Sequence, residues 1–373
     1  MPELVDIRNA DDTRDVIHRA VHLLAEGELV AFPTETSYVA AAFSLQKSGL
    51  EKLKRAGDVE STAPRPLLIK SAHEALDYVP DMPALGRKLA RRCWPGPVTI
   101  GFDVSASEGL LKQLPAETLS LSVIDNEAHF RVTAGATLTE VLRLLPAPLI
   151  MLPETDTGQE PMTTAAEVAN RYGDQLAMII DNGPSRFGNA STVIRVTGEN
   201  WRIVVAGIVN ETTLARLASE VYLFVCTGNT CRSPMAEGFF RKFLAERLQC
   251  SEEELSDRGY IVESAGLAAN VGASATPESV DVVAKMGIDL RRHASQPLSD
   301  RLLDHSDHIF TMTRVHRDAI LSMRPDISDR LSLLSRDEDD ISDPIGGGIA
   351  EYEKCKEEIE RHVRSLMNDI VLK

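Results

Sequence analysis

The sequence predicts an α/β protein built from two domains. Helix-like and strand-like segments alternate along the chain, and apolar residues (43%) and charged residues (26%) occur in an ordinary globular balance. The chain has 373 residues, which is more than a single hydrophobic core usually organises. After a helix-like stretch at 210–219, the pattern restarts with the apolar run "VYLFVC" at 221–226. We therefore expect one domain over residues 1–210 and another over residues 220–373.

The first domain is expected to be an α/β twisted sheet covered by helices. Apolar residues recur at spacings of three and four over 15–27, which is typical of an amphipathic helix, and the apolar run at 28–33 ends at a proline. A strand is expected at 98–102, a helix followed by a strand within 164–184, and two closing strands at 191–196 and 201–209. This order places helices on a single sheet.

The second domain is expected to be an open parallel sheet. Its strands are predicted at 222–225, 260–267 and 308–313. Helices are predicted between and after them, at about 234–248, at 276–287, after 314–318, and finally over 350–372. Strands that alternate with helices are typical of parallel sheets.

Charge and cysteine content exclude several classes of protein. The formal net charge of −16, with both halves acidic, argues against a dedicated nucleic-acid protein, because phosphate binding depends on lysine and arginine. Five cysteines in a long chain without the pattern of a secretory leader predict a cytoplasmic protein. The apolar runs are too short to span a bilayer, so we expect no membrane contact.

The stretch "FVCTGNTCRSPMAE" at 224–237 carries the chemistry of the second domain. Cys226 ends a strand, and a helix begins about seven residues later. A thiolate is favoured near a helix N-terminus and an arginine, and the backbone N–H groups of such a loop form an anion nest. Arg232 supplies a planar fork for two phosphoryl oxygens. The loop is therefore expected to bind a phosphate dianion above a thiolate, without a metal or other cofactor.

This loop resembles the C-x5-R-S signature of the low-molecular-weight protein tyrosine phosphatases. The similarity extends from about 222 to 373 and includes "ESAGL", "KMGIDLRRHASQPL", "HIFTMTRVHRDAI" and "SDPIGGG" in the family's order. The resemblance implies that Cys226 attacks phosphorus, Arg232 binds the equatorial oxygens and Asp343 is the general acid. It also implies phosphorylated proteins as substrates. The phosphate-binding residues that it implies are Thr227, Gly228, Asn229, Thr230, Cys231 and Ser233, of which Ser233 steadies the thiolate and Asn229 holds the shape of the loop.

The remaining cysteines indicate no second redox or metal centre. Cys93, Cys250 and Cys355 are interpreted as small packing residues. The loop cysteines lack a second pair at zinc-ligand spacing, and the chain lacks the two close downstream cysteines of thioredoxin-coupled arsenate reductases. Cys231 is either a partner for a protective disulfide with Cys226 or a packing residue.

The choice between phosphoarginine and phosphotyrosine depends on two positions. Within the family, Thr230 resembles the protein-arginine phosphatases, because the tyrosine-specific members carry a larger aliphatic residue there. Ile345 stands where both branches tend to have an aromatic residue, and its presence removes a stacking surface for a phenyl ring. We favour phosphoarginine and keep phosphotyrosine as the alternative.

The first domain resembles the YrdC-type threonylcarbamoyladenylate synthases. The resemblance rests on "GELVAFPTETSYVAAA", "KLKR", "RPLLIK", "WPGPVTI" and "NASTVIRV". It implies ATP as a cofactor, and its nucleotide or substrate candidates are Thr34, Thr36, Lys54, Arg55, Ser191 and Thr192. The chain departs from the family at 122–127, where an Arg-x-Pro is expected, at 152–158, where a Ser-Ala-Asn is expected, and at 203–209, where an arginine is missing.

These departures leave two interpretations of the first domain. One is an active synthase for tRNA modification, which would make the protein bifunctional. The other is a degenerate domain that binds double-stranded RNA, a nucleotide or a protein partner without turnover. Residues 51–100 hold more basic than acidic side chains, which fits either a solvated face or a nucleic-acid patch.

Overall fold

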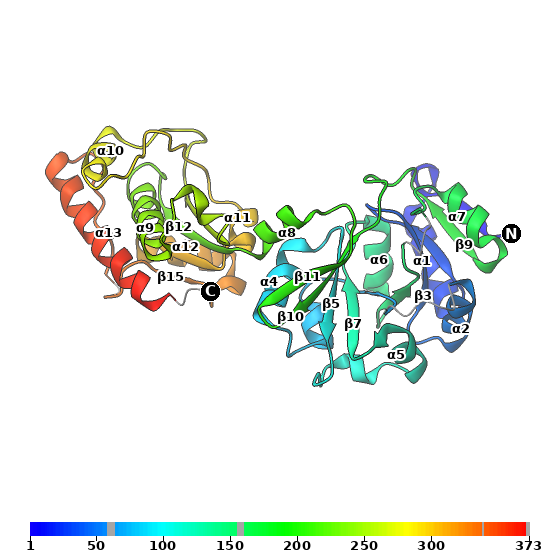
Figure 1. The fold of residues 1–373 in the computed structure, drawn as a ribbon. Coiled ribbons are helices and arrows are strands. Elements are labelled where there is room, and N and C mark those ends of the chain that lie inside the picture. The colour runs from blue at the N-terminus through cyan, green and yellow to red at the C-terminus, as the bar shows by residue number, and fades with distance from the viewer. Residues whose placement is uncertain (58–63, 155–159, 338, 371–373) are drawn as a thin grey trace. The chain divides into compact units, whose positions relative to one another are not determined.

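The α/β class is confirmed by a computed structural model that describes residues 1–57, 64–154, 160–337 and 339–370. The chain divides into two compact units, Met1–Leu217 and Ala218–Lys373 (Figure 1). Within the described ranges, none of the helices has the length and apolar character needed to cross a membrane.

The N-terminal unit is built on one mixed sheet of eleven described strands. Their order is β1-β9-β2-β3-β8-β4-β7-β5-β10-β11, with β6 beside β7. The strands are β1 (Glu3–Asp6), β2 (Val30–Pro33), β3 (Tyr38–Phe43), β4 (Leu67–Leu68), β5 (Val98–Asp103), β6 (Val123–Ile124), β7 (Glu127–Arg131), β8 (Leu149–Met151), β9 (Met178–Asp181), β10 (Thr192–Thr197) and β11 (Asn200–Val205). The helices are α1 (Thr13–Ala25), α2 (Lys47–Ala56), α3 (Glu74–Tyr78), α4 (Ala84–Cys93), α5 (Ala116–Ser122), α6 (Ala136–Leu144), α7 (Ala165–Tyr172) and α8 (Glu211–Ala218).

The centre of this sheet is apolar and supports one polar turn. Strands β2 and β3 pair antiparallel and are buried along their whole length, so the turn that joins them, residues 34–37, is fixed at their ends. Helices α1 and α6 pack their apolar stripes against one face of the sheet, with Leu24 and Leu138 fully buried. The polar residues of the turn are thereby held against β7 and the segment after β8.

The C-terminal unit contains a four-stranded parallel sheet in the order β13-β12-β14-β15. The strands are β12 (Glu220–Cys226), β13 (Tyr260–Gly266), β14 (His308–Thr311) and β15 (Leu331–Leu333). The helices are α9 (Arg232–Leu248), α10 (Pro277–Ala284), α11 (Asp300–His305), α12 (Arg314–Met323) and α13 (Ile349–Asp369). The chain runs from β12 to β13 on one side and then crosses to β14 on the other. The end of β12 is therefore a topological switch point, where ligands of open α/β sheets bind.

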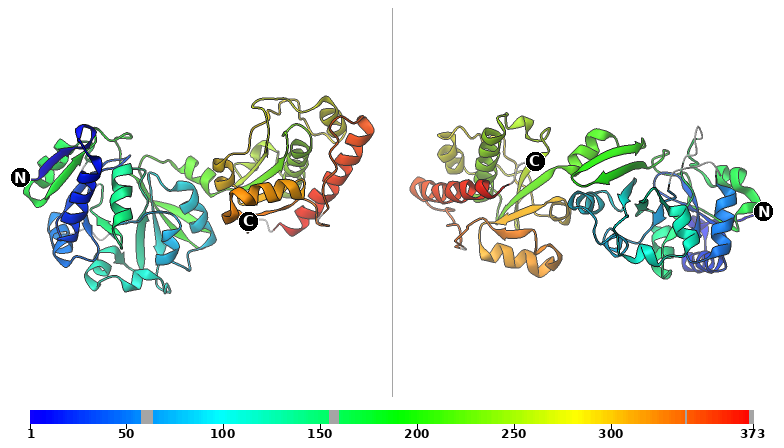
Figure 2. Two further views of the ribbon diagram at one scale, coloured as in Figure 1. Left: turned by 180° about the vertical axis from the view of Figure 1, so that it is seen from behind. Right: turned by 60° about the horizontal axis from the view of Figure 1, so that its bottom comes forward.

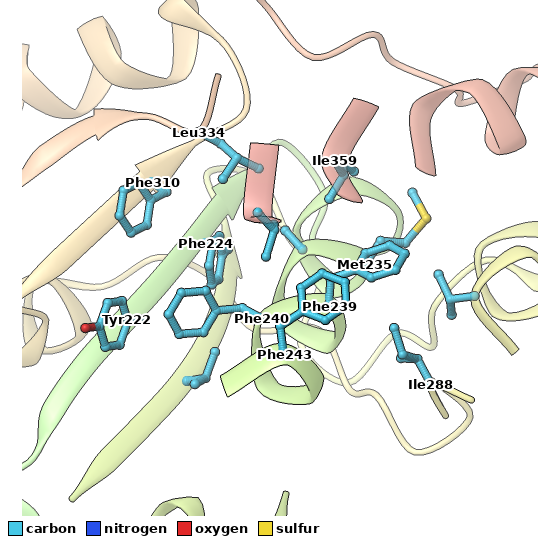
Figure 3. Close-up of a cluster of buried hydrophobic side chains, with 14 of the residues drawn as sticks. Tyr222, Phe224, Met235, Phe239, Phe240, Phe243, Ile288, Phe310, Leu334 and Ile359 are labelled. Carbon is cyan, nitrogen blue, oxygen red and sulfur yellow. The ribbon is translucent and has the colours of Figure 1, made fainter. Parts of the chain in front are cut away.

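Helices cover both faces of this parallel sheet, which explains the continuous apolar sequence of β12. Tyr222 and Phe224 point toward α9, where they meet Phe240 in the aromatic cluster of Figure 3. Leu223 and Val225 alternate to the opposite face, which α11 and α12 cover. Helix α13 packs against α9, beside which it lies in Figure 2, and closes the first face with its apolar stripe.

Two helices begin earlier than the sequence pattern predicts. Helix α9 begins at Arg232 rather than at about 234, because the first turn after the loop is buried and continues directly into the helix. Helix α12 begins at Arg314 rather than after Asp318, because the Thr313 side chain accepts a hydrogen bond from the His316 N–H and caps the helix there. Both shifts place helical residues next to the loop after β12.

Candidate functional site

The loop 226–232 places a buried thiol against two hydrogen-bond donors. Cys226 is the last residue of β12 and is only 3% exposed. Its Sγ lies 3.0 Å from the Ser233 Oγ and 3.2 Å from the backbone N of Asn229. A hydroxyl and an N–H directed at sulfur stabilise the thiolate form. The geometry therefore suits a nucleophilic sulfur.

Asn229 fixes the shape of the loop. Its φ of 54° lies in the left-handed region, which is uncommon for a residue other than glycine. The side chain is fully buried and bonds in three directions, donating from Nδ2 to Ser233 Oγ (2.9 Å) and Ser264 Oγ (2.8 Å) and accepting at Oδ1 from the N–H of Gln296 (2.9 Å). Its carbonyl oxygen also lies 2.7 Å from His293 Nε2. These contacts hold the strained conformation in place.

Strand β13 approaches this loop closely because it ends in glycine. A Cβ added at Gly266 would lie 2.6 Å from the Thr227 carbonyl oxygen and 2.9 Å from the Asn229 backbone nitrogen. Leu267 and Ala268 then donate their N–H groups to the carbonyls of Cys226 and Thr227. The backbone oxygens on this side of the loop are thus satisfied by the neighbouring segment.

Arg232 and Asp343 meet above the loop. The guanidinium is 5% exposed and forms a short ion pair between its Nη2 and the Asp343 Oδ2, while the Asp343 side chain is 45% exposed. Arg232 also directs Nη1 to the Ile341 carbonyl at 3.4 Å and Nη2 to the Thr227 Oγ1 at 3.5 Å. The structure therefore brings a thiol and an arginine of one loop together with a carboxyl group from a distant part of the chain.

Thr227 is linked to a buried histidine that the sequence analysis did not single out. Its Oγ1 lies 2.9 Å from the Nε2 of His316, which is 5% exposed. Burial, together with the charge of Arg232, lowers the pKa of His316 to about 4, so the ring is neutral at ordinary pH. Thr227 Oγ1 also accepts from Arg232 Nη2, so the threonine connects this histidine to the arginine.

The remaining loop residues differ in exposure. Gly228 and Thr230 are partly exposed. Cys231 turns inward, and its Sγ lies 3.5 Å from both Thr276 Oγ1 and Tyr352 Oη. All five cysteines carry free thiols. In the described part of the chain, no group of three or more histidine, cysteine or carboxylate side chains is placed to hold a metal ion.

In the N-terminal unit, donors from three segments converge on one buried carboxylate, that of Glu154. Its Oε1 accepts hydrogen bonds from the hydroxyls of Thr36 (a short contact) and Ser37 (2.7 Å). Its Oε2 accepts from the Ser191 N–H at 2.8 Å and, more closely, from the Ser191 hydroxyl. Arg131 Nη1 lies 2.8 Å from the same oxygen.

Arg131 completes this cluster and is itself fully buried. Its Nη2 donates to Glu35 Oε1 at 2.9 Å and to Thr36 Oγ1 at 2.7 Å, and the second oxygen of Glu35 accepts from the Ala134 N–H. Burial would by itself raise the pKa of Glu154, but the charge of Arg131 and the surrounding hydroxyls outweigh it and lower the pKa to about 2. We call Glu35, Thr36, Ser37, Arg131, Glu154 and Ser191 the Glu154 cluster.

Only some of the predicted N-terminal site residues join this cluster. Thr36 and Ser191 contact Glu154 directly, and Thr34 Oγ1 lies 2.9 Å from Thr36 Oγ1. Thr192 instead exchanges hydrogen bonds with the backbone of Val209.

Lys54 and Arg55 are exposed in the last turn of α2, and no contact between described residues joins them to Glu154. The longer loop expected after them falls on 58–63, and most of the departure at 152–158 falls on 155–158; both lie outside the described residues.

The sequence analysis missed Glu35, Arg131 and Glu154. The expected Arg-x-Pro position, 122–127, lies on β6 and the start of β7, whereas the arginine in the cluster is at the end of β7. Arg131, at the end of a buried strand, could have indicated this cluster, because an arginine is almost never fully buried without a charged partner.

The comparisons assign the C-terminal unit to a class of enzyme, the phosphatases. The family model described as low molecular weight phosphotyrosine protein phosphatase matches residues 221–373. A protein-arginine-phosphatase of Bacillus subtilis (strain 168) is 37% identical over 152 residues, which are 40% of this chain and 95% of that protein. A probable low molecular weight protein-tyrosine-phosphatase of Ralstonia nicotianae is 34% identical over 145 residues, or 39% and 91% of the two chains.

The chain belongs to the low molecular weight phosphotyrosine protein phosphatase family through this unit. A solved arginine phosphatase from Geobacillus stearothermophilus is 34% identical, with a TM-score of 0.35, and the match covers 40% of this chain and 91% of that one.

The N-terminal unit is similar to a second family. The model described as telomere recombination matches residues 22–207. A putative threonylcarbamoyl-AMP synthase of Mycobacterium tuberculosis (strain ATCC 25618 / H37Rv) is 26% identical over 217 residues, which are 58% of this chain and 95% of that protein. A threonylcarbamoyl-AMP synthase of Pyrococcus abyssi is 28% identical over 181 residues, which are 48% of this chain and 51% of that protein.

The Glu154 cluster predicts an acid-sensitive N-terminal unit. Because the folded pKa of Glu154 is about 2, below its ordinary value of 4.5, the carboxylate stabilises the fold above about pH 5 and loses this contribution as the pH falls toward 2. Glu154→Gln should lower the free energy of unfolding by about 3 to 5 kcal/mol at pH 7 and flatten its decline in acid. Urea unfolding followed by tryptophan fluorescence measures this, because Trp94 and Trp201 both lie in the N-terminal unit.

Glu160→Gln, at an exposed position of the same segment, is the matched control. An equal pH dependence in the parent and in Glu154→Gln would contradict the assigned role of the carboxylate.

Proposed function

We propose that the C-terminal unit hydrolyses phosphoarginine in proteins through a phosphocysteine intermediate on Cys226. The observation that carries the proposal is the convergence of the Ser233 hydroxyl and the Asn229 N–H on the Cys226 sulfur, with Arg232 and Asp343 paired above it. This arrangement holds a nucleophile, an anion-binding fork and a proton donor within one loop region.

In the proposed first step, the Cys226 thiolate attacks phosphorus while the bond from phosphorus to the leaving atom breaks. The equatorial oxygens replace Asp343 as the partner of Arg232, and Asp343, in its protonated form, gives its proton to the leaving nitrogen or oxygen. In the second step, water attacks the phosphocysteine, Asp343 accepts a proton from that water, and inorganic phosphate leaves with the thiolate restored. Neither step calls for a metal or other cofactor.

One side chain of the loop supports phosphoarginine as the substrate, because Thr230 offers a hydroxyl to a polar leaving group. Ile345, which is 67% exposed, provides no aromatic surface for a phenyl ring, but it departs from the arginine branch as well as from the tyrosine branch. Two of the relatives with similar sequences carry the name protein-arginine-phosphatase. Phosphotyrosine is the alternative substrate, since relatives named as tyrosine phosphatases are also similar over this unit.

For the N-terminal unit we propose that it does not carry out the synthase reaction. The supporting observation is that Glu154 already occupies the donors of Thr36, Ser37, Ser191 and Arg131. A substrate anion would have to displace a carboxylate held by charge-assisted hydrogen bonds. An active synthase that uses ATP is the competing interpretation.

Substitution of the nucleophile and the acid should have separable effects. Cys226→Ser should abolish hydrolysis and retain inorganic phosphate binding by calorimetry, because the nest and Arg232 remain. Asp343→Asn should slow turnover of phenyl phosphate by about 10²- to 10⁴-fold and that of 4-nitrophenyl phosphate much less, because only the poorer leaving group needs the proton.

Asp339→Asn, which alters an exposed carboxylate near the same loop, is the control. Normal turnover by Cys226→Ser, or equal losses on the two esters with Asp343→Asn, would refute the assigned roles.

The substrate class is tested by turnover of matched phosphoarginine and phosphotyrosine peptides, with Cys226→Ala as the blank. We expect a higher kcat/KM on phosphoarginine, and a shift toward phosphotyrosine in Thr230→Ile, which removes the hydroxyl and adds apolar surface. A preference for phosphotyrosine in the parent chain would replace the proposed substrate with its alternative. Hydrolysis of neither peptide would overturn the proposal.

The synthase interpretation is tested in the full chain carrying Cys226→Ala, so that phosphatase activity does not interfere. Given ATP, threonine and bicarbonate, this variant should release no pyrophosphate above the level seen without threonine. The Pyrococcus abyssi synthase, assayed in parallel, serves as the positive control. Threonine-dependent pyrophosphate release would establish an active synthase.

A further inference from the structure

A line of hydrogen bonds runs from Cys226 beneath the phosphate loop to a carboxylate on α9. Cys226 Sγ contacts Ser233 Oγ, both serine hydroxyls of the line accept from Asn229 Nδ2, and Ser264 donates to Glu237 Oε2 at 2.6 Å. The line thus has a thiol at one end and an acid at the other. None of the proposed chemical steps uses Glu237.

The direction of every hydrogen bond in this line is determined by its neighbours. The Gln296 N–H points at Asn229 Oδ1, so the amide nitrogen faces the two serines and can only donate. Each serine oxygen accepts one of these hydrogens and must place its own proton elsewhere. Ser264 finds the carboxylate of Glu237, and Ser233 finds the sulfur of Cys226 at 3.0 Å, closer than the Ala265 carbonyl at 3.4 Å.

Glu237 is well placed to act as the terminal acceptor. Its side chain is 21% exposed, and Arg241 Nη1 lies 3.8 Å from its other oxygen. The charged or titratable groups around it are Arg241 on the same helix, Glu263 on β13 and His293. Burial raises the pKa of Glu237, and the Ser264 hydrogen bond and the charge of Arg241 oppose that rise. The pKa of this carboxyl group therefore depends on the contacts that it makes.

We propose that Glu237 is a positioning residue that, through Ser264 and Asn229, holds the Ser233 hydroxyl against the Cys226 sulfur. Without an acceptor at the far end, Ser264 loses the partner that fixes its hydroxyl, and Asn229 loses an ordered acceptor for one of its hydrogens. Asn229 Nδ2 is then held less firmly between the two serines, so the Ser233 hydroxyl is less well aligned with the sulfur. The inference rests on the proposed nucleophilic role of Cys226.

A simple effect of charge makes the opposite prediction. A carboxylate near a thiolate disfavours it, so removal of the charge alone would lower the pKa of Cys226. Loss of the hydrogen-bond line would raise that pKa instead. The sign of the change therefore separates the two explanations without any measurement of turnover.

The experiment measures the rate of alkylation of Cys226 by iodoacetamide as a function of pH in the full chain. Fragment-ion mass spectrometry separates Cys226 from Cys231. The variants are Glu237→Leu, which removes the acceptor, and Glu237→Gln, which removes the charge and keeps an acceptor oxygen. Glu246→Leu, at an exposed position on the same helix, is the matched control. Protection by inorganic phosphate shows that each variant keeps a folded loop.

We expect Glu237→Leu to raise the apparent pKa of Cys226 by about half a unit to one unit, which slows alkylation about threefold to tenfold below that pKa. Glu237→Gln should stay within about twofold of the parent. In a Ser264→Ala background, Glu237→Leu should have no further effect on the pKa of Cys226, because the hydroxyl that links Glu237 to Asn229 is already absent.

Other results would overturn the inference. A lowered pKa in both Glu237 variants would leave only the effect of charge, and no change in either would remove Glu237 from the line. If Cys226 of the parent chain is not alkylated as a thiolate at neutral pH and inorganic phosphate does not protect it, the proposed function itself is wrong. If the parent behaves as expected and Glu237→Leu matches it, only the role of Glu237 fails.

Discussion

The shape of the loop 226–232 depends on the side-chain amide of Asn229. This residue adopts a left-handed backbone conformation, for which glycine would be the unstrained choice. Glycine would lack the three hydrogen bonds that the amide makes to Ser233, Ser264 and Gln296. These hydrogen bonds offset the backbone strain, and they join β13 and the start of α9 to the loop. The same amide contacts the Ser233 hydroxyl that lies against the Cys226 sulfur.

Each unit contains a carboxylate that accepts a hydrogen bond from a serine hydroxyl, but the surroundings of the two carboxylates differ. Glu237 contacts Ser264, which links it through Asn229 to the loop 226–232. Glu154 sits among the donors of its own cluster and satisfies them internally. Arg131 shows the same contrast with Arg232. The former is fully buried between two acids, whereas the latter pairs with an aspartate whose side chain remains 45% exposed.

The sequence predicted the surroundings of the loop 226–232 more completely than the N-terminal cluster because of how far apart the residues lie in the chain. The thiol, its serine and Arg232 fall within eight consecutive positions, so the strand before the loop and the helix after it could be deduced together. Asp343 is 111 residues from Arg232, and only the family resemblance connected them. Thr36 and Glu154 are 118 residues apart, and Glu154 stands where the chain departs from the family pattern, so neither spacing nor resemblance indicated their contact. Helix starts were misplaced where a cap or a buried first turn, rather than apolar spacing, determines them.

The contact between Arg232 and Asp343 links ligand binding to the proposed chemistry. Neighbouring contacts hold both groups. Arg232 donates to the Ile341 carbonyl, and Ser342, the residue before Asp343, donates its N–H and its hydroxyl to Glu358. A phosphoryl dianion offers the guanidinium two oxygens in a plane, a better match than the single Asp343 oxygen that it contacts in this structure. A bound substrate would therefore take the arginine and release Asp343 toward the leaving group. Since Asp343 is the more exposed partner, it is the one that can move without opening the core, and the acid becomes available only when there is a phosphoryl group to cleave.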